Sequence, residues 1–262
     1  MTDAALPEGS PATGSAAGED GPPPVEPRFR SDVTVRVVRH SASDRDVLWA
    51  ARVSTAGEDS LAELEREPER SKGLINFLMR DRHGSPFEHN SMTFLVTAPI
   101  FVFREFHRHR VGWSYNEESG RYRRLEPVFY IPDESRNLVQ RGRPGQYEFV
   151  PGTPEQHKMV RESMEDSYRR SYAAYLEMLE AGVAREVARA TLPVGLFSSM
   201  YATCNARSLM HFLGLRTRHE LARVPSFPQR EIEMVAELME AEWARLMPLT
   251  HAAFNTNGRV AP

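Results

Sequence analysis

The sequence predicts a mixed α/β fold, a single domain with a central sheet flanked by helices. Two observations predict this class. β-Prone and helical segments alternate in the first half of the chain, and the chain is mostly helical from Glu155 onward. With 262 residues, 40% of them hydrophobic, the chain is long enough to bury one sizeable core. We expect this domain to span residues 28–257.

The first elements follow from local patterns. Met1–Pro27 has no aromatic residue and repeated prolines, so we expect a disordered tail because it cannot offset its ordering entropy. Val33–Val38 is rich in β-branched residues and is predicted as a strand. Ser43 is suited to cap a helix that runs to about Ser54. Apolar residues at helical spacing predict a second helix over Ser71–Arg82.

A turn, a strand and a third helix are expected next. His83–His89 contains a glycine and a proline that break the preceding helix, and Ser91–Thr97 is apolar and β-prone. Pro99 is suited to the first position of a helix over Ile100–His109, because its missing N–H would be unpaired there in any case. That helix would deliver Arg108 and Arg110 at its C-terminal end.

The second half is expected to be helical after one exposed excursion. Arg136–Pro154 is rich in Arg, Gly, Pro and Gln, which is typical of an exposed loop. The predicted helices that follow are Glu155–Ala181, Val183–Ala190, Ser198 to about Leu213, and Pro228–Met247.

Composition excludes several classes of protein. A single cysteine, Cys204, excludes an intrachain disulfide and a cysteine-based metal cluster. No window approaches the roughly 20 apolar residues of a membrane span, and the first residues do not resemble a secretion signal. The net charge of −3 gives no general argument for binding nucleic acid. We therefore expect a cytoplasmic protein.

The run Arg108–Tyr122 is the strongest functional pattern. Arginine presents a planar fork of donors that fits phosphate, so Arg108, Arg110 and Arg121 are suited to grip an anion from a helix end and the following loop. A glutamate in the run can accept from imide or ribose groups, and Ser119–Gly120 lets backbone N–H groups approach an anion closely. The pattern favours a nucleotide monophosphate site.

Other interpretations of this run stay open at this point. It could be a solvated basic loop with surface ion pairs worth ~0–1 kcal/mol each. Trp113, Tyr115 and Tyr122 argue against that, because aromatic residues in a polar loop usually stack on something. The same interleaving of charges and aromatics also fits single-stranded nucleic acid, which remains a second hypothesis.

The run also resembles a known family. Arg108-His-Arg110, eight further residues and Ser119, with Asn116-Glu117 and Arg121-Tyr122 in place, are similar to the motif of the flavin-dependent thymidylate synthases. Further blocks resemble that family in the same order, from about Val33 to Met247: His83–His89, Ala98–Val102, Ala188-Arg189 with Leu192-Pro193, and Asn205–Arg216.

The resemblance implies an activity and a set of ligands. Such enzymes methylate dUMP to dTMP with methylenetetrahydrofolate as the one-carbon donor and with hydride from FAD that NADPH has reduced. A homotetramer with shared active sites, and neither nucleic acid nor a membrane as partner, is implied as well. The FAD contacts implied are Ser85 of a neighbouring subunit, Arg108, His109, Arg110, Glu117, Asn205, Arg207 and His211.

The nucleotide contacts implied by the resemblance form a second set. They are Glu105, Arg108, Glu117, Glu118, Ser119, Gly120, Arg121, Arg189 and Arg216. Family members usually carry glutamine where this chain has Glu105, and often asparagine where it has His211. Arg216 is implied as the catalytic residue that favours ionisation at N3 of the uracil. The physics agrees, because a permanent cation stabilises a developing anion strongly in a dry site.

Three competing sites are weighed against this assignment. Cys204 could be a nucleophile, but its apolar surroundings favour a buried, inert thiol. Ser114 lacks the second glycine of a nucleophile elbow, and no obvious base partners Ser114 or Ser119, so binding roles are expected. A zinc site among the nearby histidines is disfavoured, because His107 and His109 would point about 200° apart on a helix. We expect no metal.

Overall fold

A four-stranded antiparallel sheet forms the centre of the fold, which we describe from a computed structural model of residues 26–56, 68–143 and 146–262. Its strand order is β2-β3-β8-β4. The predicted tail, Met1–Pro27, lies outside the described residues except for its last two. The strands are β1 (Arg28–Arg30), β2 (Thr34–His40), β3 (Met92–Pro99), β4 (Trp113–Glu117), β5 (Val128–Tyr130), β6 (Val139–Arg141), β7 (Glu148–Val150) and β8 (Phe197–Cys204).

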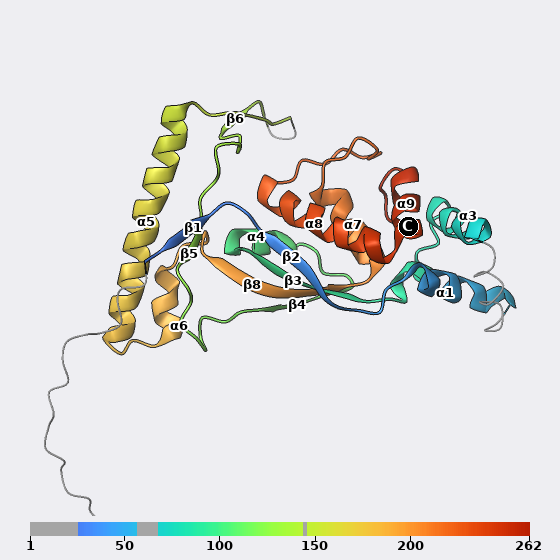
Figure 1. Ribbon diagram of the computed structural model, residues 1–262, viewed down its shortest axis with the longest axis horizontal. Coiled ribbons are helices and arrows are strands. Elements are labelled where there is room, and N and C mark those ends of the chain that lie inside the picture. The colour runs from blue at the N-terminus through green and yellow to red at the C-terminus, as the bar shows by residue number, and fades with distance from the viewer. Residues whose placement is uncertain (1–25, 57–67, 144–145) are drawn as a thin grey trace, which may run out of the picture.

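Helices cover one face of this sheet (Figure 1). The α-helices are α1 (Asp44–Ala56), α3 (Pro68–Arg80), α4 (Ile100–Phe106), α5 (Pro154–Glu180), α6 (Arg185–Ala188), α7 (Ala206–Arg216), α8 (Arg230–Leu246) and α9 (Pro248–Thr256). Two short 3-10 helices, η2 (Ser85–Glu88) and η3 (Arg189–Thr191), complete the described elements. These elements confirm the predicted mixed α/β class. No helix in the described ranges is long and apolar enough to cross a membrane.

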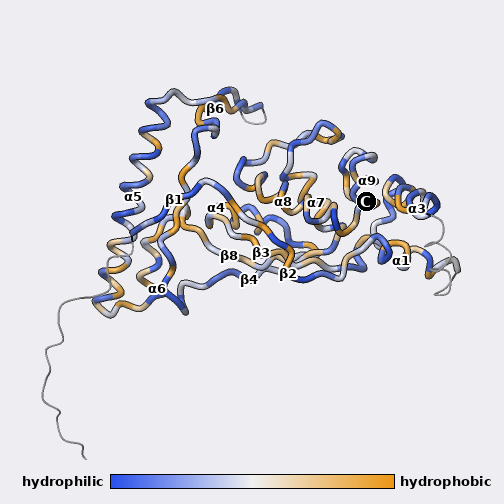
Figure 2. Tube along the Cα trace, in the orientation of Figure 1, coloured by the Kyte–Doolittle hydropathy of each residue, from blue (hydrophilic) through white to orange (hydrophobic). Residues whose placement is uncertain are grey.

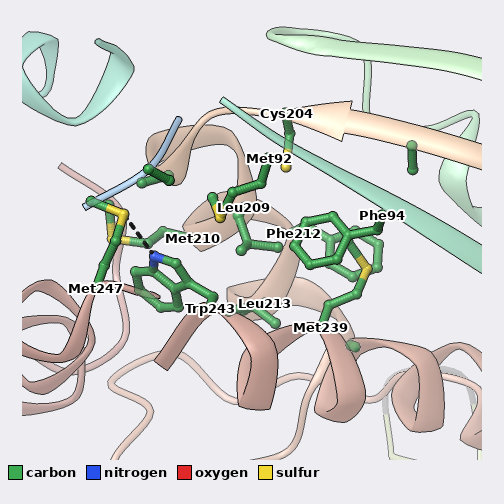
Figure 3. Packing of buried hydrophobic residues seen from close by; sticks show 14 of the residues in the cluster. Met92, Phe94, Cys204, Leu209, Met210, Phe212, Leu213, Met239, Trp243 and Met247 are labelled. Atoms are coloured by element: carbon green, nitrogen blue, oxygen red, sulfur yellow. Dashed lines mark hydrogen bonds between the residues drawn. The ribbon is translucent and has the colours of Figure 1, made fainter. Parts of the chain in front are cut away.

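The main core lies between the sheet and helices α4, α7 and α8. Alternate residues of β3 point into it, among them the fully buried Met92, Phe94 and Val96. Figure 3 shows Phe94 beside Phe212 of α7, and Trp243 of α8 donating to the Met247 sulfur at 3.4 Å. Figure 2 shows hydrophobic stretches in these elements, as burial of one helix face requires.

A second, smaller core fixes the long helix α5. Tyr168, Tyr172 and Tyr175 recur at helical spacing on one face of α5 and are buried against β5 and α6. Tyr168 stacks on Phe129 with ring centroids 4.7 Å apart. The rest of α5 is largely hydrophilic (Figure 2), so the tyrosine face holds this helix to the fold.

Most predicted elements in the described ranges are confirmed to within a few residues. They correspond to β2, α1, α3, β3, α5 and α8. Most described residues of the Arg136–Pro154 excursion are exposed, as predicted, although Arg136–Val139 are half-buried and the segment contains the hairpin β6–β7. The predicted helix Val183–Ala190 is shorter, since α6 ends at Ala188 and η3 continues as a 3-10 turn.

One predicted helix is wrong in its first half. The chain from Ser198 to Cys204 is a strand, because it pairs with β3 on one side and with β4 on the other. Helix α7 begins only after Asn205, whose side chain accepts from the backbone N–H of Ser208 at 2.8 Å. The alternation of buried Met200, Ala202 and Cys204 is the strand signal in this segment.

Two boundaries around the arginine run also differ from the prediction. Helix α4 ends at Phe106, so Arg108 and Arg110 lie in a turn and not on a helix. After this turn the chain forms β4, which was expected as a loop. Trp113 and Tyr115 pack on the core and alternate with exposed Ser114 and Asn116, as an edge strand requires.

Candidate active site

The Arg108–Arg110 turn is anchored on the core through its histidine. His109 is buried, and its ring lies 4.8 Å from the ring of Phe212. The Tyr115 hydroxyl donates to the carbonyl oxygens of Phe106 and His109 at 3.1 and 2.8 Å. Arg108 and Arg110 remain exposed on either side. The turn therefore holds one imidazole rigidly and leaves two guanidinium groups at the surface.

Gly112 brings this turn close to helix α7. Its φ of +70° is one that other residues adopt rarely, and a Cβ there would lie 2.2 Å from the Ser208 hydroxyl oxygen. That hydroxyl donates to the Val111 carbonyl oxygen at 2.9 Å. A side chain at position 112 would break this contact, so the glycine fixes the turn against α7.

A cavity of about 330 Å³, which we call the α7 pocket, lies where the turn meets the helix. Its lining residues are Glu88, His109, Arg110, Val111, Trp113, Arg207, Ser208 and His211. The pocket thus brings together four residues predicted as flavin contacts, which come from segments about 100 residues apart in the sequence. Arg207 and His211 lie one turn apart on α7, as predicted.

Arg207 is held in place by the η2 turn. Its Nη1 donates to Glu88 Oε1 at 2.5 Å and its Nε to the Pro262 carbonyl oxygen at 2.6 Å. The guanidinium also lies over Gly84, where a Cβ would come within 2.6 Å of Nε. Ser85 is exposed at the start of η2 and does not line the α7 pocket of its own chain.

The Arg216 guanidinium sits at the end of α7 between Glu105 and His109. Its Nη1 donates to Glu105 Oε2 at 2.5 Å and its Nε to His109 Nε2 at 3.0 Å. Burial, and then the charges of Arg216 and His211, lower the pKa of His109 to about 4. The imidazole is therefore neutral at pH 7, with the lone pair on Nε2 facing Arg216. Together, Glu105 and His109 orient the guanidinium.

The Glu117–Arg121 segment follows β4 and is folded back on itself. The Glu118 backbone N–H donates to the Ser199 carbonyl oxygen at 2.9 Å. The Ser119 hydroxyl accepts from the Arg121 backbone N–H at 3.3 Å. Gly120 is buried, and a Cβ there would lie 2.8 Å from Leu125 and 3.3 Å from Arg189. The tight packing places Arg189 directly beside this segment.

Partial burial, opposed by neighbouring polar and charged groups, shifts the protonation of Glu117. Partial loss of hydration raises the pKa of the Glu117 carboxyl above its usual value, although Ser198, His107 and Arg189 oppose this shift. Nearby, Arg121 pairs with Glu186 at 3.1 Å. The segment thus carries exposed cations beside a carboxyl that binds its proton more readily than an ordinary glutamate.

The described contacts form two separate groups. Glu105, His109 and Arg216 contact one another, and the Glu117–Arg121 segment contacts Arg189 and the start of β8. None of the residues of that segment lines the α7 pocket. The sequence had implied a single nucleotide site from both groups, and within one chain the described contacts do not bring them together.

Comparison with known proteins decides the family. The family model described as "Thymidylate synthase complementing protein" matches residues 36–249. The flavin-dependent thymidylate synthase of Streptomyces avermitilis is 80% identical over 238 residues, which cover 91% of this chain and 97% of that protein. The chain belongs to the flavin-dependent thymidylate synthases. The enzyme of Tropheryma whipplei is 56% identical over 91% of the chain and 98% of its own length.

Solved structures share the fold of this flavin-dependent thymidylate synthase. The UMP/dUMP methylase PolB from Streptomyces cacaoi, bound with 5-Br dUMP, has a TM-score of 0.84 and 55% sequence identity, and the match covers 90% of this chain and 100% of that one. The same protein bound with 5-Br UMP gives a TM-score of 0.82 at 54% identity, over 90% and 99% of the two chains.

The aromatic residues of the arginine run have a structural role in this thymidylate synthase. Trp113 and Tyr115 stack on each other with centroids 5.7 Å apart and pack around Phe106. The position of Tyr115 is therefore explained by packing, without a ligand for it to stack on. Trp113 also lines the α7 pocket. Tyr122 is 77% exposed beside Arg121.

Sequence reasoning missed Glu88 as a site residue of the synthase. This carboxylate lines the α7 pocket and pairs with Arg207, 119 positions further along the chain. The only local signal is its place in the His83–His89 turn, which the family resemblance includes. A pairing across that sequence separation appears only when the fold is known.

Cys204 is the one cysteine of this thymidylate synthase, and the structure makes it inert. It lies in the buried face of β8, 3% exposed, and burial raises the pKa of its thiol far above the usual range. A thiol that stays protonated and out of reach of substrate is not a nucleophile. Ser119, one of the two serines also considered as a nucleophile, accepts a hydrogen bond through its Oγ from the Arg121 backbone N–H.

We expect the substitution Cys204→Ala to leave dTMP formation nearly unchanged. The lost sulfur leaves a small cavity, so the free energy of unfolding should fall by roughly 1 kcal/mol. Steady-state assays and a thermal melt of the purified variant measure both quantities. A collapse of turnover in a variant that melts near the wild-type temperature would reinstate Cys204 as a nucleophile.

Proposed function

We propose that the chain methylates dUMP to dTMP with FAD bound at the α7 pocket. The observation that carries this proposal is the pocket itself, which joins His109 and Arg110 to Arg207 and His211. Two guanidinium groups suit the diphosphate of such a cofactor, and the half-buried Trp113 offers a flat apolar surface. Arg108 and Asn205 flank the pocket, and Glu117 and a neighbouring subunit's Ser85 complete the proposed contacts.

The nucleotide would lie against the Glu117–Arg121 segment. Arg121 and Arg189 are exposed there and suited to the phosphate, since guanidinium forks match phosphate oxygens. Glu118, Ser119 and Gly120 present polar atoms and backbone N–H groups in a compact turn. Streptomyces cacaoi PolB, which shares this fold, is described as a UMP/dUMP methylase and was solved with 5-Br dUMP.

Arg216 lies with Glu105 and His109 in the other of the two groups, and it would act from there on the uracil ring. A fixed guanidinium beside N3 stabilises negative charge that develops on the pyrimidine during methylation. Glu105 and the neutral His109 hold the guanidinium in one orientation, so little reorganisation is needed when substrate binds. Glu105 thus positions Arg216, a role that a glutamine at this position would fill without a charge.

FAD reduced by NADPH would supply the hydride, and methylenetetrahydrofolate the one-carbon unit. The chain's part is to hold the nucleotide, orient Arg216 and keep His109 neutral. Both NADPH and the folate are proposed as co-substrates on the family's chemistry. The cytoplasmic location expected from the sequence stays a prediction, as does the absence of a nucleic-acid partner.

The separation of the two groups of residues supports a shared site. If Arg216, Glu105 and Arg108 of one chain face the Glu117–Arg121 segment of another, each site is complete only in an assembly. This is the arrangement expected of the proposed homotetramer. Such sharing also accounts for the exposed position of Arg108, which hydrogen-bonds to no side chain among the described residues.

An absorbance spectrum followed by a product assay tests the proposal. The chain reconstituted with FAD should be yellow, bleach when NADPH is added, and form dTMP from dUMP and methylenetetrahydrofolate. UMP in place of dUMP is the matched control for the sugar. A protein that cannot be loaded with FAD, or that binds single-stranded oligonucleotides with a steep salt dependence and makes no dTMP, would overturn it.

A further inference from the structure

We propose that Tyr172 and Tyr175 of α5 are positioning residues for the phosphate of the nucleotide. They act through Leu125, which connects the tyrosine face of α5 to Gly120 of the Glu117–Arg121 segment. The inference rests on the proposed function, because it takes that segment as the place where the nucleotide binds. It gives a part in substrate binding to α5, a helix that carries none of the predicted site residues.

Both tyrosine hydroxyls bind the backbone of one residue. The Tyr175 hydroxyl accepts from the Leu125 backbone N–H at 3.3 Å, and the Tyr172 hydroxyl donates to the Leu125 carbonyl oxygen at 3.1 Å. The Tyr172 hydroxyl also accepts from Arg124 Nε at 3.3 Å. Leu125 lies outside the described strands and helices, so side chains pair its backbone groups where a neighbouring strand would otherwise do so. The two hydroxyls therefore fix both polar backbone groups of Leu125.

Burial makes these hydrogen bonds important. Tyr172 is 2% exposed, Tyr175 is fully buried and Leu125 is 8% exposed, so water cannot readily replace a lost partner. The two tyrosine rings are neighbours on α5, with centroids 5.7 Å apart. Phenylalanine rings would fill the same space, so packing alone requires no hydroxyl at either position. The contacts with Leu125 explain why both residues carry one.

Leu125 passes this constraint to the nucleotide segment. Gly120 is buried so closely against it that an added Cβ would lie 2.8 Å from Leu125 Cδ1. The same Cβ would lie 3.3 Å from Cδ of Arg189, whose guanidinium is proposed to bind the phosphate. A shift of Leu125 therefore changes the position of Gly120 relative to Arg189.

Arg189 is tied to the same core from its own side. It directly follows Ala188, which is fully buried in the second core together with Tyr172 and Tyr175, and Leu192 packs against that core just after η3. Figure 1 shows α6 beside α5 at this end of the sheet. The tyrosine face thus supports both groups proposed to hold the phosphate. Groups that are held in place in advance need little reorganisation when an anion binds.

Removal of the two hydroxyls from the FAD-reconstituted full chain tests the proposal. Tyr172→Phe combined with Tyr175→Phe keeps both rings but leaves the Leu125 backbone without its partners. We expect the dissociation constant for dUMP to rise about tenfold, while that for deoxyuridine, which lacks the phosphate, changes by less than about twofold. The KM for dUMP should rise in parallel, with kcat and FAD content close to wild type. Calorimetry and steady-state assays measure these quantities.

Tyr168→Phe is the matched control. Tyr168 lies on the same face of α5 and in the same core, but its hydroxyl lies against Gly195 and not against Leu125. This variant should leave both dissociation constants unchanged. Tyr175→Phe alone should raise the dissociation constant for dUMP severalfold, and it provides the test if the double variant does not fold.

The outcomes separate this inference from the proposed function. A wild-type chain that neither binds dUMP nor forms dTMP would overturn the proposed function, on which the inference rests. A wild type that binds dUMP, with an unchanged preference for dUMP over deoxyuridine in the Tyr175→Phe and double variants, would overturn the inference alone. An equal loss of affinity for both ligands, together with loss of FAD, would show a purely structural role and would also overturn it.

Discussion

Replacing Arg216 with alanine is expected to lower the rate of dTMP formation by at least about 100-fold, the usual effect of removing a group that stabilises transition-state charge. The loss should fall on kcat more than on the KM for dUMP, since the guanidinium acts on charge that develops during the reaction. Steady-state kinetics with saturating FAD, NADPH and folate measure both constants.

Arg218→Ala is the matched control for this experiment. Arg218 lies two residues further along the chain, and its side chain is 55% exposed with Glu233 as its partner. It should retain nearly full activity. FAD content and melting temperature establish that the Arg216→Ala protein is folded and loaded. A folded, FAD-loaded Arg216→Ala enzyme with more than about a tenth of wild-type kcat would refute the role proposed for Arg216.

Replacing Arg259 with methionine is expected to cause the largest loss of stability. Its guanidinium is 1% exposed and donates to both carboxylate oxygens of Glu240, at 2.6 and 2.7 Å, and to the Thr217 hydroxyl at 2.9 Å. Removing one partner of a buried pair leaves the other charge uncompensated, at a cost of about 3–5 kcal/mol. For a chain of this size we expect the melting temperature to fall by roughly 10 °C.

The pH dependence of this loss follows from Glu240. Burial would raise its pKa, but Arg259 and His251 outweigh burial and lower it to about 2, below the usual 4.5. The pair therefore stabilises the folded state above pH 4.5, and this contribution disappears as the pH falls toward 2. The wild type and the variant should converge in stability over that range. A difference in the free energy of unfolding between the wild type and the variant that does not change with pH would contradict this account.

Arg245→Ala is the control for the stability experiment. Arg245 pairs with Glu242 on the exposed side of α8, and its side chain is 71% exposed. Such a surface pair contributes about 0–1 kcal/mol, so the melting temperature should change little. Thr217 follows Arg216 directly in the chain. A partly folded Arg259→Met variant should therefore also misplace Arg216, so that its activity falls by more than its fraction of folded protein does.

Periodicity in the sequence predicted the elements that bury one face and expose the other. The tyrosine face of α5 and the apolar face of α8 are visible as helical spacing, and both helices form close to their predicted bounds. The segment Ser198–Cys204 was predicted as a helix although its buried residues alternate, because so short an apolar run is also compatible with a helix. Pairing with two neighbouring strands decided in favour of the strand, and no local signal reports such pairing.

For the candidate site, too, the sequence does not report which distant residues pair with each other. Four residues that line the α7 pocket, His109, Arg110, Arg207 and His211, could be named from the family resemblance, because motif residues keep their order in the sequence. The pairing of Glu105 with Arg216 and of Glu88 with Arg207 could not, since each joins positions more than 100 residues apart. The buried thiol of Cys204 was expected from its apolar neighbours, although the element that buries it was not.

Mixing two inactive variants tests the central claim that each active site draws Arg216 and the Glu117–Arg121 segment from different chains. Arg216→Ala and Arg121→Ala proteins, differently tagged and allowed to exchange subunits, should each be nearly inactive alone. In mixed assemblies some sites then contain neither substitution, so up to about one quarter of wild-type dTMP formation should return. Copurified mixed assemblies that remain inactive would show that both groups act within one chain and would contradict the account.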